Sequence, residues 1–367
     1  MKKDYFYFSP CFWKKNPLVS GGLKVYLVWF DSMGAKSSSL LVETPDLRIL
    51  VDPGAAAMQP SYPLPDEKKA KLRKVALRFI KKAAKKADIV FISHYHYDHH
   101  TLPGEAKEIY QNKTLWIKNP NLFINLSQFE RARLFLRELL GKRFDKVLSS
   151  PPFFSPEDPL EHLPLARKKD WGAYTKRKEE LILKGRRWFE KVVEKWREGP
   201  FIDEEKAKKY KIYFADGNFF QIGGTRVRFT RPLFHGVEYD RVGWVVGLVV
   251  EFNEKRFIYT SDIQGPAIED YAVWIIKENP SILVIDGPPT YLLGYMLNYI
   301  NFERCIENFV NILKNTSTEV IIYDHHLLRE KGYLRKMERI YREVAGEGKK
   351  VLTAAEWYNK IPLVLQI

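Results

Sequence analysis

Half of the histidines in this chain lie in one short stretch, which constrains the fold more than any other feature. The segment His94-Tyr95-His96-Tyr97-Asp98-His99-His100 contains four of the eight histidines. It directly follows residues 88–92, an apolar run that predicts a buried strand. Open α/β proteins build their sites on loops at the carboxyl ends of strands. The sequence therefore predicts an α/β sheet that carries a functional loop at one edge.

The residue types in this loop indicate metal binding. Imidazole nitrogens together with a carboxylate form the donor set that zinc and similar divalent cations prefer. The alternative is a polar turn that contains histidine by chance, and a lone histidine would favour that interpretation. Four histidines within seven positions favour the metal site instead.

The same pattern, a strand followed closely by a ligand-type residue, recurs later in the chain. The later residues are His235 after the predicted strand 225–229, Asp262 after 256–260, and His325 with His326 after 319–323. Each of them alone is more often an ordinary loop residue. Their occurrence together with the histidine cluster favours a second group of metal ligands.

The remaining chain predicts two β-rich halves, each followed by helices. Further predicted strands comprise residues 23–30, 38–42, 48–51, 114–118, 218–222, 244–252, 282–285 and 350–352, and predicted helices comprise residues 66–87, 127–140, 179–198, 302–313 and 330–344. Asp66 is the expected N-cap of the first helix. Gly223-Gly224 predicts a hairpin between residues 218–222 and 225–229.

A basic segment interrupts this pattern between the two halves. Residues 151–211 contain proline-rich loops and a lysine- and arginine-rich helix, and they lie between two ligand-bearing regions. We therefore expect one domain over residues 1–367, with residues 151–211 as an insertion within it. The insertion is expected to serve as a lid, a substrate arm or a contact in a homo-oligomer.

The charge of +15 has two interpretations. A strongly positive protein attracts polyanions and phosphate-bearing substrates, and nucleic acid is among the candidate partners. A lysine- and glutamate-rich chain with few cysteines is also typical of a heat-adapted proteome. The second interpretation explains the density of charge but not the excess of one sign, so an anionic substrate is expected.

No feature predicts membrane insertion or export. The longest apolar run, residues 243–250, is too short to span a bilayer. No apolar segment of a signal peptide follows Met1-Lys2-Lys3-Asp4-Tyr5. Cys11 and Cys305 lie far apart and predict neither a disulfide framework nor a thiolate metal site. A cytoplasmic protein without membrane contact is the simplest expectation.

The order of these motifs resembles a known family. Asp52, His94-x-His96-x-Asp98-His99, His235, Asp262 and His325 resemble the five motifs of the metallo-β-lactamase superfamily. The similarity covers residues 23–352 without the insertion, and it is strongest to a group of archaeal proteins described as predicted hydrolases. It implies an α/β fold, a four-layer αβ/βα sandwich, with two metal ions in the crevice between its halves.

The resemblance also implies a role for each ligand residue. It assigns His94, His96 and His235 to the first metal, Asp98, His99 and the last histidine to the second, Asp262 to both, and an orienting role to Asp52. Either His325 or His326 can be the last ligand, and we prefer His325 because related nucleases have an arginine four residues later, here Arg329.

The other residues of the site have candidate roles in the reaction. Asp98 and Asp262 can accept a proton from water, His326 is a candidate proton donor or substrate contact, and Arg329 is a candidate anion contact. His96 stands where the iron-dependent oxygen reductases of the superfamily usually have glutamate. This favours two Zn²⁺ ions and hydrolysis, with Mn²⁺ and Fe²⁺ as the other candidates.

Three functions remain open at this point. The leading hypothesis is hydrolysis of a phosphodiester or another phosphate-bearing substrate, such as RNA or a nucleotide. The second is hydrolysis of a lactone, thioester or amide by the same metals, and the third is a binding protein with a structural metal. The spacing of Tyr291, Tyr295 and Tyr299 is typical of a buried helix face, so these tyrosines do not favour nucleic-acid binding.

Overall fold

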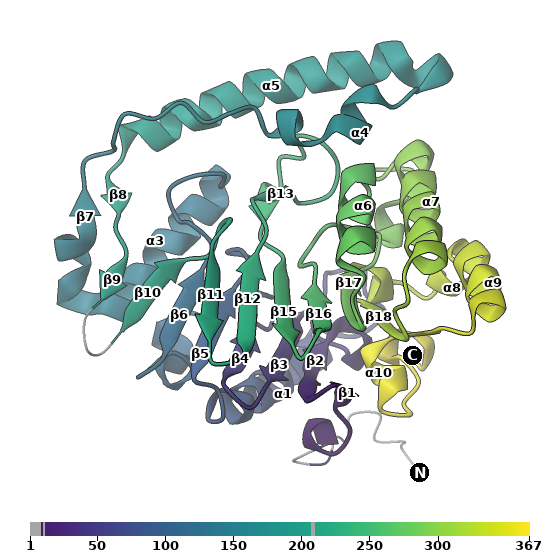
Figure 1. The fold of residues 1–367 in the computed structure, drawn as a ribbon, viewed down its shortest axis with the longest axis horizontal. Coiled ribbons are helices and arrows are strands. Elements are labelled where there is room, and N and C mark those ends of the chain that lie inside the picture. The colour runs from purple at the N-terminus through teal and green to yellow at the C-terminus, as the bar shows by residue number, and fades with distance from the viewer. Residues whose placement is uncertain (1–8, 10–11, 207–209) are drawn as a thin grey trace.

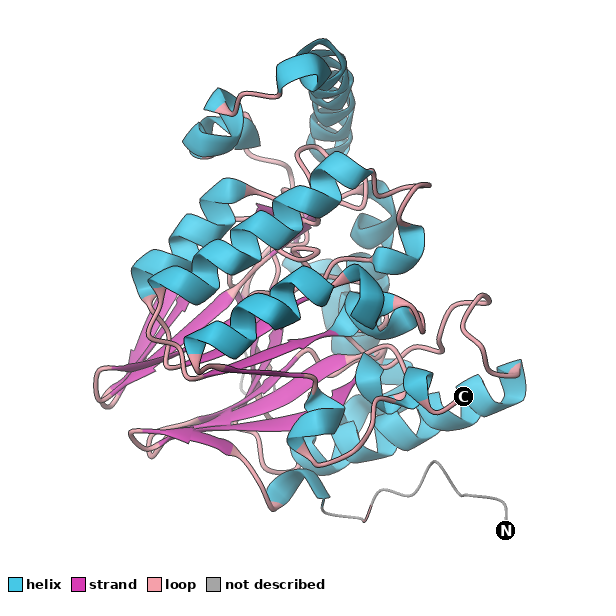
Figure 2. Ribbon diagram, turned by 90° about the vertical axis from the view of Figure 1, so that its right-hand side faces the viewer, coloured by secondary structure: helices cyan, strands magenta, loops and turns pink. Residues whose placement is uncertain are grey.

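The chain folds into two β-sheets that face each other, with helices on both outer faces (Figure 2). The computed structural model describes residues 9, 12–206 and 210–367. Met1–Tyr5 and Cys11, on which two expectations rested, lie outside the described residues. The arrangement of helix, sheet, sheet and helix confirms the predicted four-layer αβ/βα sandwich.

The first sheet contains the strands of the N-terminal half. Its order is β1 (Leu18–Ser20), β2 (Leu23–Phe30), β3 (Ser38–Glu43), β4 (Arg48–Val51), β5 (Ile89–Ile92), β6 (Thr114–Ile117), β10 (Lys211–Phe214) and β9 (Glu205–Lys206). The pairs from β1 to β4 are antiparallel, whereas β4, β5, β6 and β10 are parallel. The predicted strands 23–30 and 48–51 are confirmed at both ends.

The second sheet contains the strands of the C-terminal half. Its order is β11 (Phe219–Ile222), β12 (Thr225–Phe229), β15 (Leu248–Phe252), β16 (Lys255–Tyr259), β17 (Ile282–Asp286), β18 (Val320–Asp324) and β19 (Lys350–Leu352). Ile222 pairs with Thr225, so the hairpin at Gly223-Gly224 is confirmed. The predicted strand 244–252 is divided into β14 (Trp244–Val245) and β15. Val246, between them, donates its N–H to the Ser93 carbonyl and so joins the two halves.

Aromatic side chains fill the space between the sheets. The ring centroids of Phe91 in β5 and Phe229 in β12 are 4.8 Å apart. Trp116 in β6 stacks on Phe220 in β11 at 4.5 Å. Since these rings come from both sheets, the core is continuous across the sandwich.

Helices cover the outer faces because each has one apolar side. The longer ones are α1 (Asp66–Ala84), α3 (Leu126–Leu140), α6 (Glu269–Glu278), α7 (Tyr299–Asn315) and α9 (Glu338–Glu347), and the short ones are α2 (Pro103–Ala106), α8 (Tyr333–Lys336) and α10 (Ala354–Trp357). In α1, Leu72, Phe79 and Ala83 are buried at helical spacing, as predicted.

Two expectations about helices were wrong, and one helix was not predicted. Pro65 is the N-cap of α1, so Asp66 is its first residue. The predicted helix 330–344 is divided at the buried Met337, whose φ and ψ of −97° and 9° are not helical. Sequence patterns missed α6 because it has ten residues and no side-chain cap at its start.

The basic segment forms an arm that crosses one end of the sandwich (Figure 1). The arm begins after β7 (Leu148–Ser149) and forms α4 (Pro164–Lys168) and the long helix α5 (Thr175–Glu198). It returns through β8 (Phe201–Ile202). Lys211 begins β10 of the first sheet, and Ile212 of β10 pairs with Glu205 of β9, so the last residues of the expected insertion 151–211 take part in that sheet. The pairing of β10 with β6 is long-range, and local patterns do not reveal it.

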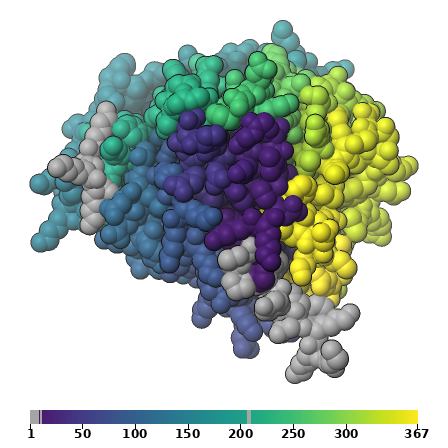
Figure 3. All heavy atoms as spheres, turned by 60° about the horizontal axis from the view of Figure 1, so that its bottom comes forward, coloured from purple at the N-terminus to yellow at the C-terminus, as the bar shows by residue number. Residues whose placement is uncertain are grey.

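The two ends of the described chain lie side by side on one face (Figure 3). The Trp357 indole N–H donates to the Asn16 carbonyl at 2.8 Å, and the Tyr358 hydroxyl donates to the Leu27 carbonyl at 2.9 Å. Of the helices in the described part of the chain, none is long and apolar enough to cross a membrane.

Candidate metal centre

The histidine cluster begins directly after β5, whose four residues are buried. The backbone N–H groups of His99 and His100 both donate to the His96 carbonyl, at 2.9 and 3.1 Å, and close the loop into a tight turn. The loop packs directly against Gly54. A Cβ at Gly54 would lie 2.3 Å from the His100 nitrogen, so only glycine allows this approach.

Four predicted ligands form the first group of donor atoms. His94, His96, His235 and Asp262 each offer an atom, and these atoms lie within 4.8 Å of one another. His94 Nε2 is 3.0 Å from His96 Nδ1, and His235 Nε2 is 3.3 Å from Asp262 Oδ2. Residues from three separate regions of the sequence therefore converge on one point.

Three other predicted ligands form a second group next to the first. Donor atoms of Asp98, His99 and His325 also lie within 4.8 Å of one another. Asp262 Oδ2 is 3.0 Å from His99 Nε2 and 3.3 Å from His325 Nε2. The Asp262 carboxylate thus lies between the two groups, where the resemblance to the superfamily places a shared ligand.

The chemistry of these groups fits two divalent cations. Asp262 Oδ1 and His235 Nε2 are buried and have no hydrogen-bond partner among the described residues. Buried polar atoms without a partner cost free energy unless another group binds them. Imidazole and carboxylate donors that converge from several sides are what a borderline cation requires.

The first group also holds its histidines in the form that binds metal. Burial lowers the pKa of His94 and His96 well below the ordinary value for histidine, and neighbouring histidines lower it further. Both rings are therefore neutral, and each has a lone pair available for a cation. Burial lowers the pKa of His100 to about 4, but this ring packs beside Tyr95 and Phe135, away from either group.

Asp52 supports the histidine loop, as the resemblance implies. Asp52 Oδ2 lies 2.8 Å from His99 Nδ1 and accepts hydrogen bonds from the hydroxyls of Ser93 and Tyr259, both at 2.6 Å. Asp52 Oδ1 accepts from the Ser93 N–H at 2.7 Å. Such contacts fix the ring orientation of a ligand histidine.

A second supporting carboxylate, Asp31, was missed from the sequence. Its Oδ1 lies 2.9 Å from His325 Nδ1, and its Oδ2 accepts from Arg329 Nε at 2.7 Å. Asp31 directly follows β2, so it repeats the pattern of a strand followed by an acidic residue. That signal was present, but the turn after β2 contains no other ligand-type side chain.

The structure gives His325 and His326 different surroundings. His325 Nε2 faces His99 and Asp262, each at 3.3 Å, in the second group. His326 Nδ1 lies 3.0 Å from both oxygens of Asp286. Burial lowers the pKa of His326 well below its ordinary value, and the charge of Arg329 lowers it further.

Two cations lie within electrostatic range of Asp98. Arg329 is buried, and its Nη2 donates to Asp98 Oδ2 at 3.2 Å. Lys36 lies within electrostatic range of Asp98, Asp31 and Arg329, and burial lowers its pKa. Lys36 forms no ion pair with any described carboxylate. Sequence patterns missed Lys36 because the glycine–lysine spacing of a phosphate loop is absent.

The expectation that three tyrosines form a buried helix face was wrong. The side chains of Tyr295 and Tyr299 are 86% and 66% exposed. Gly294 has a φ of 85°, which no α-helix contains, and α7 begins only at Tyr299. Only Tyr291 approaches the centre, where its hydroxyl lies 3.5 Å from Arg329 Nη1.

Comparison with known proteins is consistent with this geometry. The family model described as "Metallo-beta-lactamase superfamily" matches residues 34–304. The chain belongs to the metallo-β-lactamase superfamily. Members of this superfamily typically bind two metal ions, and the described His/Asp cluster has donors for them. The protein is a metal-dependent hydrolase of this superfamily.

Two archaeal relatives align with nearly the whole length of this chain. The UPF0282 protein of Korarchaeum cryptofilum is 31% identical over 331 residues, which cover 90% of this chain and 87% of that protein. The UPF0282 protein of Methanopyrus kandleri is 30% identical over 355 residues, with coverages of 94% and 97%. The match to this archaeal group confirms the resemblance on which the site residues were assigned.

Solved structures resemble the chain at low identity. Unliganded yeast PDE1 has a TM-score of 0.42 and 9% identity, with 90% of this chain and 97% of that chain covered. Igni18, a metallo hydrolase from Ignicoccus hospitalis, has a TM-score of 0.31 and 14% identity, with coverages of 87% and 92%.

Proposed function

We propose that this hydrolase acts on a phosphodiester or another phosphate-bearing substrate, with RNA and nucleotides as the leading candidates. The observation that carries the proposal is the pair of cations beside Asp98. Arg329 donates to the Asp98 carboxylate and Lys36 lies within electrostatic range of it, and neither charge is needed to hold a metal. Guanidinium and ammonium groups near a metal centre stabilise the charge of a phosphoryl group.

Lys36 supports this assignment more strongly than Arg329. Arg329 is already held by Asp31, whereas Lys36 forms no ion pair with a described carboxylate. A partly buried ammonium group without an ion-pair partner is costly unless an anion binds beside it. The net charge of +15 adds a long-range attraction for the same class of substrate.

We propose that two Zn²⁺ ions occupy the centre. His94, His96, His235 and Asp262 would hold one ion, and Asp98, His99, His325 and Asp262 the other. When bound, such a pair provides hydroxide near neutral pH and polarises the phosphoryl oxygen. The excess of imidazole over carboxylate ligands favours zinc over manganese or iron.

The side chains of the chain have separate roles in this proposal. Asp98 and Asp262 are the carboxylates able to accept a proton at the centre. Asp52 and Asp31 keep the His99 and His325 rings in position. We assign His326 to substrate contact, because its lowered pKa makes it a poor proton donor and Asp286 holds its Nδ1.

A substrate panel on the metal-loaded protein tests the proposal. The panel contains RNA, small phosphodiesters and phosphorylated metabolites, with a lactone, a thioester and an amide as competing classes. We expect turnover of a phosphate-bearing member that Asp98→Ala abolishes. Lys36→Met should lower kcat/KM for that substrate by about tenfold or more, since a charged hydrogen bond is lost.

Lys68→Met is the matched control, because Lys68 is exposed on α1. It should leave kcat/KM unchanged. Turnover of the lactone, thioester or amide alone would contradict the proposal, and so would phosphate turnover that Lys36→Met does not affect.

A further inference from the structure

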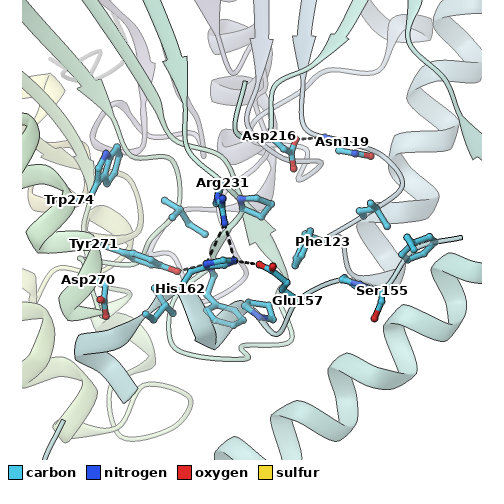
Figure 4. Close-up of a pocket in the computed structure, with 18 residues that line it drawn as sticks. Asn119, Phe123, Ser155, Glu157, His162, Asp216, Arg231, Asp270, Tyr271 and Trp274 are labelled. Atoms are coloured by element: carbon cyan, nitrogen blue, oxygen red, sulfur yellow. Dashed lines mark hydrogen bonds and ion pairs between the residues drawn. The ribbon is translucent and has the colours of Figure 1, made fainter. Parts of the chain in front are cut away.

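A second cavity lies outside the metal centre, where the arm meets the core (Figure 4). Its volume is about 670 Å³, and no predicted metal ligand lines it. One wall comes from the arm, between Phe154 and Leu163, and the other from Leu233 and Phe234 in β13 and from α6. Pockets that bind small organic molecules have volumes of about 300–1,000 Å³. The arm therefore creates a ligand-sized space that the sandwich alone does not have.

Most of the lining is apolar and aromatic. The aromatic side chains that line the cavity are Phe123, Phe154, Phe234, Tyr271 and Trp274. Flat apolar molecules bind well between such rings, because stacking and edge contacts add to the burial of apolar surface. The shape and composition favour a planar body over a flexible polar chain.

The carboxylates of the lining are already paired within the protein. Asp216 binds the Lys118 ammonium group and the Asn119 N–H. Asp270 accepts hydrogen bonds from the backbone of Leu165 and Ala166 in α4, at 3.1 and 2.9 Å. The Glu157 carboxylate is 2.9 Å from His162 Nε2. Each of these carboxylates therefore already has a partner within the protein.

Arg231 is the exception among the charged groups. Its Nη1 lies 3.1 and 3.3 Å from the two ring nitrogens of His162, and it has no ion pair with a carboxylate in the part of the chain that the structure describes. Figure 4 shows Arg231 and His162 in the middle of the cavity, with Tyr271 and Trp274 on one side and Phe123 on the other. The charged group of the cavity without a carboxylate partner is therefore the central Arg231 guanidinium.

We propose that this cavity binds a small organic anion with a planar apolar body. The anionic group would pair with the Arg231 guanidinium, and the rings would lie among the aromatic side chains. Because Leu233 and Phe234 directly precede His235, the bound molecule would touch the strand that leads into the metal centre. The site needs no metal, so its test does not depend on the proposed substrate.

Two matched probes test the proposal on the full-length, metal-loaded protein. Anilinonaphthalene sulfonate joins flat apolar rings to one sulfonate, and phenylnaphthylamine has the same rings without the sulfonate. We expect one sulfonate site per chain by fluorescence titration and calorimetry. Arg231→Gln should weaken sulfonate binding by about tenfold or more, because a charge-assisted hydrogen bond is lost, and should leave phenylnaphthylamine binding unchanged. Phe154→Ala should weaken both probes.

Arg226→Gln is the control, since Arg226 is an exposed arginine on β12 beside Phe219. It should change neither affinity, and circular dichroism should show that all variants are folded. The proposal is overturned if Arg231→Gln binds the sulfonate as tightly as the wild type, or if Arg226→Gln weakens binding equally. Several weak sites per chain in place of one would also overturn it.

Discussion

At the scale of single residues, three carboxylates each contact the Nδ1 atom of a histidine and keep its ring in position. Asp52 contacts His99, Asp31 contacts His325 and Asp286 contacts His326, each through Nδ1. The Nε2 atoms of His99 and His325 are then left to face the centre. Such outer contacts fix the tautomer of each ring and increase its basicity as a ligand.

Asp31→Asn should weaken the binding of one metal ion more than that of the other. Asp31 contacts His325 of the second group and none of His94, His96 or His235. We expect the affinity for the second metal to fall by about 10–100-fold, while the first metal stays bound. Metal analysis after dialysis against a dilute chelator should give a stoichiometry near one per chain.

Asp66→Asn is the control for this change, because the Asp66 side chain is 95% exposed. It should keep both metals. Equal loss of both metals from Asp31→Asn would argue against separate support of the two groups.

At the scale of elements, the ends of strands place the residues of the proposed metal centre. Asp52, Ser261 and His325 follow β4, β16 and β18, and all have a positive φ, of 43°, 55° and 64°. Residues other than glycine seldom adopt this conformation, and it costs about 1–3 kcal/mol at each position. Since similar turns follow three strands, the fold of the sandwich imposes the geometry of the centre.

Helix α5 depends on a glycine where it crosses the loop after His235. A Cβ at Gly185 would lie 2.4 Å from the Tyr239 Cβ. Gly185→Ala should therefore destabilise the protein by about 1–3 kcal/mol, although alanine favours helices. Chemical denaturation measures this, and limited proteolysis should show that α5 is cleaved faster.

Gly346→Ala provides the contrast, because no atom lies within 4 Å of a Cβ built at this position in α9. It should leave stability unchanged or raise it by up to about 1 kcal/mol. If both substitutions acted alike, close packing of α5 on Tyr239 would not explain the result.

A buried ionic cluster holds the same arm to the body. Glu238 pairs with Lys178 of α5 and with Arg304 of α7, whose Nη2 is 2.6 Å away. Burial raises the pKa of Glu238, but Arg304 and Lys178 more than offset this and lower it to about 2. The pair therefore stabilises the fold fully above the ordinary glutamate pKa of about 4.3, and this contribution is lost as the pH falls towards 2.

Glu238→Gln should reduce the free energy of unfolding at neutral pH by about 3–5 kcal/mol, because Lys178 loses its carboxylate partner and Arg304 keeps only Glu269. The difference from the wild type should shrink as the pH falls from about 4.3 to 2. Urea titrations across this range measure both effects. Glu108→Gln, which breaks the exposed pair with Lys81, should cost less than about 1 kcal/mol, and a constant difference at every pH would contradict the argument.

At the scale of the whole molecule, the centre joins the two halves of the sandwich. His94, His96, Asp98 and His99 follow a strand of the first sheet, whereas Asp262 and His325 follow strands of the second. Bound metals would therefore crosslink the sheets across their interface. A ligand that binds only the folded state stabilises it in proportion to the logarithm of its concentration.

Metal removal should lower the melting temperature and make unfolding depend on metal concentration. At a free metal concentration of about 1,000 times Kd, one ion contributes about 4 kcal/mol. Calorimetry of the metal-free and reloaded protein measures the shift. The variant Asp262→Ala should show a much smaller shift, and an unchanged Tm after complete metal removal would contradict the crosslink.

Much of this molecule is visible in local patterns. Apolar runs predicted the strands of the second sheet and most of the first, without β1, β9 and β10, because burial on both faces leaves a signal in the sequence itself. The proposed ligand residues were selected because each follows such a run. Features with weaker local signals were not predicted. Helix α6 lacks a capping side chain, and the exposure of Tyr295 follows from a turn at Gly294.

The sequence by itself therefore determined the superfamily, the order of the strands along the chain and the list of candidate ligands. Only the tertiary structure decided which residues meet. It brought Asp31 to His325, Arg329 to Asp98 and the arm to Arg231, although up to about three hundred positions separate these partners. The physical reason is that burial repeats with the local period of a strand or helix, whereas contacts between distant residues depend on how the sheets pair and pack.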